Sequence, residues 1–467
     1  MAAPVRLRQG RRAACLGWLV VAAAVGPAAA AAQEPAATAL DFGAARQRLL
    51  QVSDALSAAE ANAGAKQQLA EATRALRLPE ISGELQRLEL RKTLELPLGS
   101  LAPVAEEYGI QSPLVFIDQK WHTRPLVKAT LPLYTGGQIP AAQSAARAAV
   151  AQADAERALQ AQTLVPQLVQ VYFGAQLAEQ ALAVRRDTRE GLERHLHNAE
   201  RLEQEGFATK AQRLQAVVAR DQAEREYQKA VNDLASMRAA LALLLRSDTA
   251  IAPITPLFVN RAPLQPLQTF RDTALDGHPQ LTRLDALVEQ AGQGVRVQQA
   301  RLKPQIYAFG QYDLRRRDAL LTEPDWVFGV GLRYTFLSGS GRDHQIAAAR
   351  EQQLQAEAGL REARNRIEIG VTQAYNAADT ARQQYLLLES SIVRAEENLR
   401  LQELAFREGQ ATSLDLIDAR LALGGARIER AQAAYQFDFA LAQLLEASGQ
   451  AERYEDYLRT AEEVLIP

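Results

Sequence analysis

The chain has 467 residues, of which 48% are hydrophobic and 23% are charged. Its 53 basic and 55 acidic residues give a net charge of −2, which supplies no excess of positive charge for binding nucleic acid, so we expect no nucleic-acid partner. A single cysteine, Cys15, excludes a disulfide within the chain.

Residues 1–32 have the composition of a secretory signal peptide. Four arginines precede an apolar run from Cys15 to Val25, and an alanine tract ends at Ala32. A membrane-anchoring helix is the alternative, but such a helix needs about 20 apolar residues. We therefore expect cleavage near Gln33, which leaves the mature chain without a thiol.

The segment 33–248 begins with a predicted helix and a pair of predicted strands. The helix should cover about 42–75 and end before Pro79, because a residue that precedes proline disfavours helical backbone angles. Alternating apolar residues predict two strands within 79–134, separated by a loop. These residues are Leu88, Leu90, Leu94 and Leu96 in the first strand and Val127, Ala129, Leu131 and Leu133 in the second.

A long helical hairpin is predicted next, over 139–245. Its first helix covers roughly 66 residues, which makes it on the order of 100 Å long at 1.5 Å per residue. Pro166 is the one kink that we expect in it. Gly206 marks the tip of the hairpin, where the first helix ends and the second soon begins.

The segment 269–450 repeats this order of elements. We predict a helix from about Gln280 to Arg301, entered by His278-Pro279 because proline suits an early helical position, then a pair of strands within 304–336 and a helical hairpin over 341–448. The tip of this hairpin is Gly409, 203 positions after the first tip.

Two further segments complete the chain. Residues 249–268 hold four prolines and are predicted to be a linker between the two copies. Residues 451–467 are predicted to be a C-terminal tail. The expected organisation is therefore a signal peptide, two repeats joined by a proline-rich linker, and a tail.

Apolar residues in both hairpins recur at spacings of four and three. In the first hairpin this seam contains Leu164, Leu168, Val171, Ala175, Ala178 and Leu182, and in the second it contains Ile367, Val371, Ala374, Ala378, Ala381 and Tyr385. A period of 3.5 residues held over this length predicts left-handed coiled-coil packing. The constant separation of the two sets indicates a duplication.

The clearest predicted strand covers 326–336. Its apolar face contains Trp326, Phe328, Val330, Leu332, Tyr334 and Phe336. Eleven residues with this alternation suit a tilted strand that crosses a bilayer, with the apolar face toward lipid. A strand in a soluble sandwich is the alternative, but four strands are too few for a sandwich. The edges of two strand pairs need partners from other chains, and a barrel shared between subunits supplies them.

The five histidines do not form a recognisable site. His195 and His197 are two residues apart on a predicted helix, so they point to different faces, and we expect both to lie on the solvated surface. The sequence lacks the motifs of zinc proteases, thiol redox proteins, serine hydrolases and phosphate-binding loops. We expect no catalytic residue, no cofactor and no metal, and hence no enzyme.

Taken together, these features resemble the TolC-like outer-membrane efflux proteins. The matching motifs are the Pro-Leu-Tyr-Thr-Gly-Gly turn at 132–137, the His-Pro-Gln-Leu helix start at 278–281, and the two hairpin tips. The resemblance covers essentially the whole mature chain. It implies a mainly α fold with a small β part, in which three subunits each give four strands to a 12-stranded outer-membrane β-barrel and coiled-coil hairpins to a periplasmic α-barrel.

The same resemblance implies a function. The chain would be the outer-membrane duct of a tripartite efflux or type I secretion system, placed in a Gram-negative outer membrane and extending into the periplasm. Its partners would be two further copies of itself, outer-membrane lipid, a periplasmic adaptor (membrane fusion) protein and an inner-membrane pump. A periplasmic coiled-coil scaffold without a pore is the alternative, but it conflicts with the strand at 326–336.

The family's tips dock onto the adaptor, which makes the tip residues candidate docking sites. They are Gly206, Phe207 and Thr209 in the first hairpin and Gly409, Gln410 and Thr412 in the second. The alternative is that the two glycines only end helices, because glycine adopts left-handed backbone angles readily.

Two carboxylates stand where the family places a ring at the periplasmic entrance. Asp415 and Asp418 are three residues apart and share a helix face, beside an expected packed stripe. That stripe contains Leu414, Ile417 and Leu421. For Asp415 a capping box with Thr412 is the alternative. Since the first copy has Gln212 and Gln215 at these positions, any ring should come from the second hairpin alone.

Overall fold

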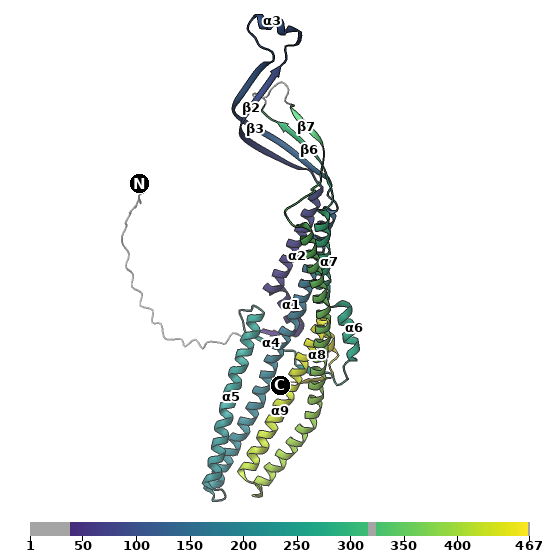
Figure 1. Cartoon of the computed structure of the whole chain (residues 1–467). Helices are drawn as coiled ribbons and strands as arrows, with labels where there is room; N and C mark the ends of the chain where they lie inside the picture. Colours follow the sequence, from purple (N-terminus) through teal and green to yellow (C-terminus); the bar gives the residue numbers. More distant parts are fainter. Residues whose placement is uncertain (1–37, 316–323, 466–467) are drawn as a thin grey trace, which may run out of the picture. The chain divides into compact units, whose positions relative to one another are not determined.

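The computed structural model describes residues 38–315 and 324–465 (Figure 1). The predicted signal peptide, residues 1–32, lies outside these ranges. The helix predicted over 42–75 is divided into α1 (Phe42–Val52) and α2 (Asp54–Ala72), followed by a short 3-10 helix, η1 (Thr73–Arg77). Ser53 interrupts the helix because its hydroxyl accepts a hydrogen bond from the Leu56 N–H at 3.3 Å and caps α2.

Four antiparallel strands form one sheet in the order β2-β3-β6-β7. They are β2 (Glu80–Leu96), β3 (Leu114–Tyr134), β6 (Gln305–Asp313) and β7 (Trp326–Arg333). The β3–β6 pairing joins the strand pairs of the two repeats. The loop between β2 and β3 holds η2 (Gly99–Leu101) and α3 (Ala102–Glu107).

One face of this sheet is apolar across β3, β6 and β7. The register places Val127, Tyr312 and Trp326 beside one another across three strands, and Ile306 beside Leu332. All six aromatic or aliphatic residues predicted to face lipid are exposed, namely Trp326, Phe328, Val330, Leu332, Tyr334 and Phe336. The predicted strand is too long, however, because β7 ends at Arg333 and the last two of these residues follow it.

The opposite face of β7 is covered by aromatic rings of β6. A Cβ on Gly331 would lie 2.7 Å from the Tyr307 ring, and a Cβ on Gly329 would lie 3.2 Å from the Phe309 ring. The two glycines therefore leave room for the rings to lie against the neighbouring strand.

Two long helical hairpins extend away from the sheet, and their tips lie at the far end (Figure 1). The first consists of α4 (Gln138–Gln204) and α5 (Lys210–Leu244), and the second of α8 (Arg342–Arg407) and α9 (Ser413–Ala447). The hairpins contact each other mainly through α4 and α9. None of the predicted seam residues is exposed, which confirms that the seam is packed against other helices.

A third long helix, α7 (Pro279–Ala300), packs against both α4 and α8. His278 caps it, because its Nδ1 accepts a hydrogen bond from the Gln280 N–H at 3.0 Å. The shorter α6 (Leu267–Gly277) packs against α8. No helix within 38–315 or 324–465 combines the length and the apolar run that crossing a membrane requires.

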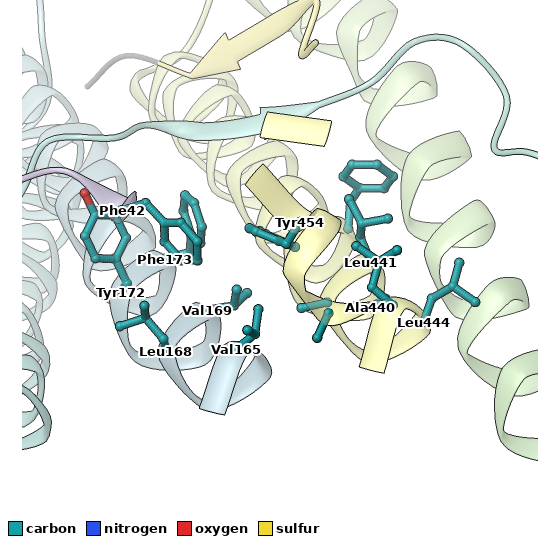
Figure 2. Packing of buried hydrophobic residues seen from close by; sticks show 14 of the residues in the cluster. Phe42, Val165, Leu168, Val169, Tyr172, Phe173, Ala440, Leu441, Leu444 and Tyr454 are labelled. Atoms are coloured by element: carbon teal, nitrogen blue, oxygen red, sulfur yellow. The ribbon is translucent and has the colours of Figure 1, made fainter. Parts of the chain in front are cut away.

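The main hydrophobic core lies where segments far apart in sequence meet (Figure 2). Phe42 stacks on Phe173 with ring centroids 5.4 Å apart and lies 5.2 Å from the Tyr454 ring. Phe258 packs edge-on against Tyr454 at 5.8 Å and against Phe437 at 6.1 Å. Segments from both repeats, the linker and the tail therefore share one core.

The segments predicted as linker and tail both contribute to this core. The linker contains β4 (Ile251–Pro253), which pairs with β1 (Thr38–Leu40), and β5 (Leu257–Val259). The tail contains η3 (Ala451–Arg453), α10 (Tyr454–Arg459) and β8 (Glu463–Leu465), which pairs with β5. Leu257, Phe258 and Val259 of the linker are fully buried, so this segment ties the two repeats together.

Candidate functional site

Each hairpin tip is closed by a glycine with left-handed backbone angles. Gly206 has a φ of 81° and Gly409 a φ of 70°. After the first glycine, the Phe207 N–H donates to the Leu202 carbonyl at 2.8 Å, and the second tip repeats this bond at the same length from the Gln410 N–H. This pattern ends a helix, so both glycines have the helix-terminating role that the alternative assigned to them.

The candidate docking residues lie at the surface of the tips. Phe207 is 81% exposed, and Thr209, Gln410 and Thr412 are exposed as well. A hollow of about 410 Å³ lies between the two tips and is lined by both, including Phe207 and Gln212 from the first and Phe406 and Gly409 from the second. The two tips therefore present one joint surface. Contact with an adaptor stays a prediction.

Asp415 occupies the third position of α9 and forms a capping box with Thr412. The Thr412 N–H and hydroxyl donate to the Asp415 carboxylate at 2.8 and 2.6 Å, and the Asp415 N–H donates back to the hydroxyl at 3.3 Å. The side-chain and backbone hydrogen bonds from Thr412 lower the pKa of Asp415. Asp415 therefore acts as a helix cap, which is the alternative given for it above. Both Asp415 and Asp418 are nevertheless exposed.

The packed stripe predicted beside these acids is only partly present. Ile417 is 5% exposed, whereas Leu414 is 50% and Leu421 is 39% exposed. The residues of α9 that pack instead are Ser413, Leu416 and Ala419, because α9 turns this side toward α4. Leu414 and Leu421 therefore lie on the same open side of the helix as the acids, and the pore-lining role of Asp415 and Asp418 stays a prediction.

His195 contradicts the prediction of a solvated surface, whereas His197 is exposed. The His195 side chain is 3% exposed, and its Nε2 lies 2.6 Å from the Ser413 hydroxyl. Its ring also packs edge-on against Phe406 at 4.9 Å. It therefore connects α4 to the end of α8 and the start of α9. The signal for this burial was its place between seam residues Leu192 and Ala199 in the helical repeat.

Burial, and to a smaller extent the positive charge of Arg420, lower the pKa of His195 from 6.5 to about 4. The imidazole is neutral at pH 7 as a result. Its other nitrogen, Nδ1, is buried and has no hydrogen-bond partner among the described residues.

Arg420 forms the second part of this contact. Its guanidinium lies directly against Gly191 of α4, where a Cβ would leave it no room, and it donates to the Glu403 carboxylate at 2.5 Å. We name Gly191, His195, Ser413 and Arg420 the inter-hairpin clasp. The clasp joins α4 of the first hairpin to α9 of the second near the tips.

The described residues contain no group of three or more His, Cys, Asp or Glu side chains that could hold a metal ion.

Comparisons with known proteins agree with the fold described above. A family model described as outer membrane efflux protein matches residues 45–245 and 270–450. A search of the curated proteins gives no significant sequence match.

Solved structures with the same fold include several outer-membrane channels. CusC is 16% identical with a TM-score of 0.72, covering 86% of this chain and 91% of its own. VceC from Vibrio cholerae is 17% identical with a TM-score of 0.68, covering 87% and 95%. The open state of MtrE from Neisseria gonorrhoeae is 18% identical with a TM-score of 0.69, covering 87% and 88%. At these identities the likeness concerns the fold.

Proposed function

The chain belongs to the outer membrane efflux protein family, and from that membership we propose that three copies form the outer-membrane duct of a tripartite efflux or type I secretion system. It is an efflux channel of the outer membrane that extends into the periplasm, and not an enzyme. A periplasmic adaptor protein and an inner-membrane pump would deliver its substrates.

The observation that carries the proposal is the four-stranded sheet. Within the described residues β2 and β7 are its edges, and exposed edges of this length need strand partners. Pairing β7 of one copy with β2 of the next would close a 12-stranded barrel from three copies. This arrangement supports the trimer because it removes both edges at once.

The two faces of the sheet have the chemistry that such a barrel requires. The apolar face of β6 and β7 suits lipid, whereas the other face carries ion pairs. Arg124 donates to Asp313 at 2.9 Å, and Lys128 pairs with Glu84. Charged pairs on the face opposite the apolar one suit a water-filled lumen. A scaffold without a pore would leave the exposed apolar face without a role.

The proposal is tested by the oligomeric state of the protein in detergent. Analytical ultracentrifugation should give a mass of three subunits, and reconstitution into a planar bilayer should give single-channel conductance. A stable monomer that forms no channel would overturn the duct.

The tip region gives the duct its candidate gate. The proposal places Asp415 and Asp418 of each copy as two carboxylate rings at the periplasmic entrance, where concentrated negative charge would bind cations. The clasp of His195 and Arg420 would hold the hairpins in their packed arrangement. The exposed tip surface around Phe207 would contact the adaptor.

A further inference from the structure

A small hollow lies where the helices meet the sheet. It has a volume of about 220 Å³ and is bordered by the turn between β3 and α4 and by the end of α7. A Cβ on Gly136 of the turn would lie 2.6 Å from the Ala300 carbonyl oxygen and 2.8 Å from the Lys303 Cβ. Only glycine permits this approach, which fixes Lys303 at the wall of the hollow.

The polar groups around the hollow are suited to an anion. Arg296 and Lys303 supply two positive charges, and Ser144 and Gln299 supply neutral donors. No carboxylate lines it among the residues that the structure describes. The Lys303 ammonium has no hydrogen-bond or ion-pair partner within 38–315 or 324–465, and Arg296 makes only a 3.5 Å contact with Gln293.

The hollow lies at the border of the apolar face of the sheet. Ile306, at the helix-side end of that face, follows Lys303 by three residues, which span at most about 10 Å of chain. The headgroup layer of a bilayer adds roughly 5 to 8 Å to each side of the hydrocarbon core. With the apolar face in lipid, the side chain of Lys303 therefore reaches the depth of the lipid phosphates.

We propose that this hollow binds the phosphate of an anionic phospholipid from the periplasmic leaflet of the outer membrane. Arg296 and Lys303 would bind the phosphate oxygens, with Ser144 and Gln299 donating further hydrogen bonds. Two cations facing one phosphodiester favour a lipid with net negative charge over a zwitterionic one. The inference rests on the proposed function, because it requires the sheet to lie in the membrane.

Native mass spectrometry of the full-length protein in mild detergent, with phosphatidylglycerol added, tests this proposal. Wild-type protein should retain phosphatidylglycerol in preference to phosphatidylcholine. Because one cation near a membrane surface contributes measurably to the binding of anionic lipid, Lys303→Gln should lower the lipid-bound fraction about fivefold. The double variant Lys303→Gln with Arg296→Gln should lower it further. Lys303→Arg should retain the lipid, as should Lys229→Gln, which removes an exposed cation on α5 far from the hollow.

A second probe distinguishes the sources of phosphate. If inorganic phosphate binds the protein while phosphatidylglycerol does not, the hollow is a site for free anions and the lipid assignment is overturned. Unchanged lipid retention in the double variant also overturns it. Flotation with liposomes separates this failure from that of the duct, because a protein whose sheet does not enter the membrane would not float even as wild type.

Discussion

Protonation of His195 should loosen the inter-hairpin clasp. In the folded protein the pKa of His195 is lowered from 6.5 to about 4, so the packed state disfavours the charged imidazole. Its surroundings are the Ser413 hydroxyl from α9, the Phe406 ring from α8 and the Arg420 guanidinium, whose charge repels a second cation. The stabilising contribution is complete above pH 6.5 and is lost as the pH falls from 6.5 to about 4.

The size of the effect follows from the pKa. A fall from 6.5 to about 4 corresponds to about 3 kcal/mol of preference for the neutral form, at about 1.4 kcal/mol for each pH unit. Acidification from pH 7 to pH 5 removes about 2 kcal/mol of this stabilisation of the packed state. Separation of the hairpins around His195 should therefore become about twentyfold more favourable over that range.

Pulsed EPR distances between the two hairpins measure this separation. Spin labels at Glu190→Cys on α4 and Ala422→Cys on α9 occupy exposed positions on either side of the clasp. Wild-type protein should gain a population at longer distance at pH 5, and His195→Gln should lose this pH response because glutamine does not titrate. His197→Gln, two residues away and exposed, is the matched control. An equal acid response in His195→Gln would refute the role of His195.

Three further perturbations test the clasp, the tips and the main core. Gly191→Ala should displace the Arg420 guanidinium and increase hydrogen exchange of the α4 segment at the clasp, whereas unchanged exchange would show that the space is not needed. Photocrosslinkers at Phe207 and Gln410 should trap the adaptor in cells that contain it, and repeated failure there would count against docking at the tips. Burial raises the pKa of Asp438, so its contribution to stability falls as the pH rises above about 3.8; Asp438→Asn should raise Tm more at pH 8 than at pH 5, and a uniform change would contradict this.

The sequence predicted the elements whose periodicity is strong. The seam through Leu168 and Val371 holds a period of 3.5 residues, and both residues are fully buried. The start of β3 was missed, because Asp118, Lys120 and His122 interrupt the alternation of apolar residues that would have indicated a strand. The start of β3 pairs with β2 residue by residue from Leu114 onward, and this pairing forms the strand regardless of the side-chain pattern.

The site was harder to predict because it depends on contacts between distant segments. His195 and Ser413 are 218 positions apart, and only the packing of α4 on α9 joins them. Spacing along one helix placed His195 and His197 on different faces, but it did not show which face was covered. Similarly, the prolines of 249–268 indicated a break between repeats but not that β5 would pair with β8.

The two tips have the same cap geometry but different charge. This difference makes it possible to test the capping role of Asp415 separately from its proposed role in a carboxylate ring. In the first hairpin the Thr209 N–H donates to the Gln212 amide oxygen at 2.8 Å, the same length as the Thr412 N–H bond to Asp415. A neutral residue therefore suffices for the cap, and the charge of Asp415 is available for another purpose.

Asp415→Gln with Asp418→Gln uses this difference as a test. The double variant should keep the cap and hence the Tm of the wild type, as the first hairpin does with Gln212 and Gln215, while removing both carboxylate rings. In planar bilayers, block by divalent or trivalent cations from the periplasmic side should weaken, because the negative potential at the entrance is lost. Asp415→Ala, which removes the cap as well, should lower the Tm. Undiminished cation block in the double glutamine variant would mean that Asp415 is only a helix cap.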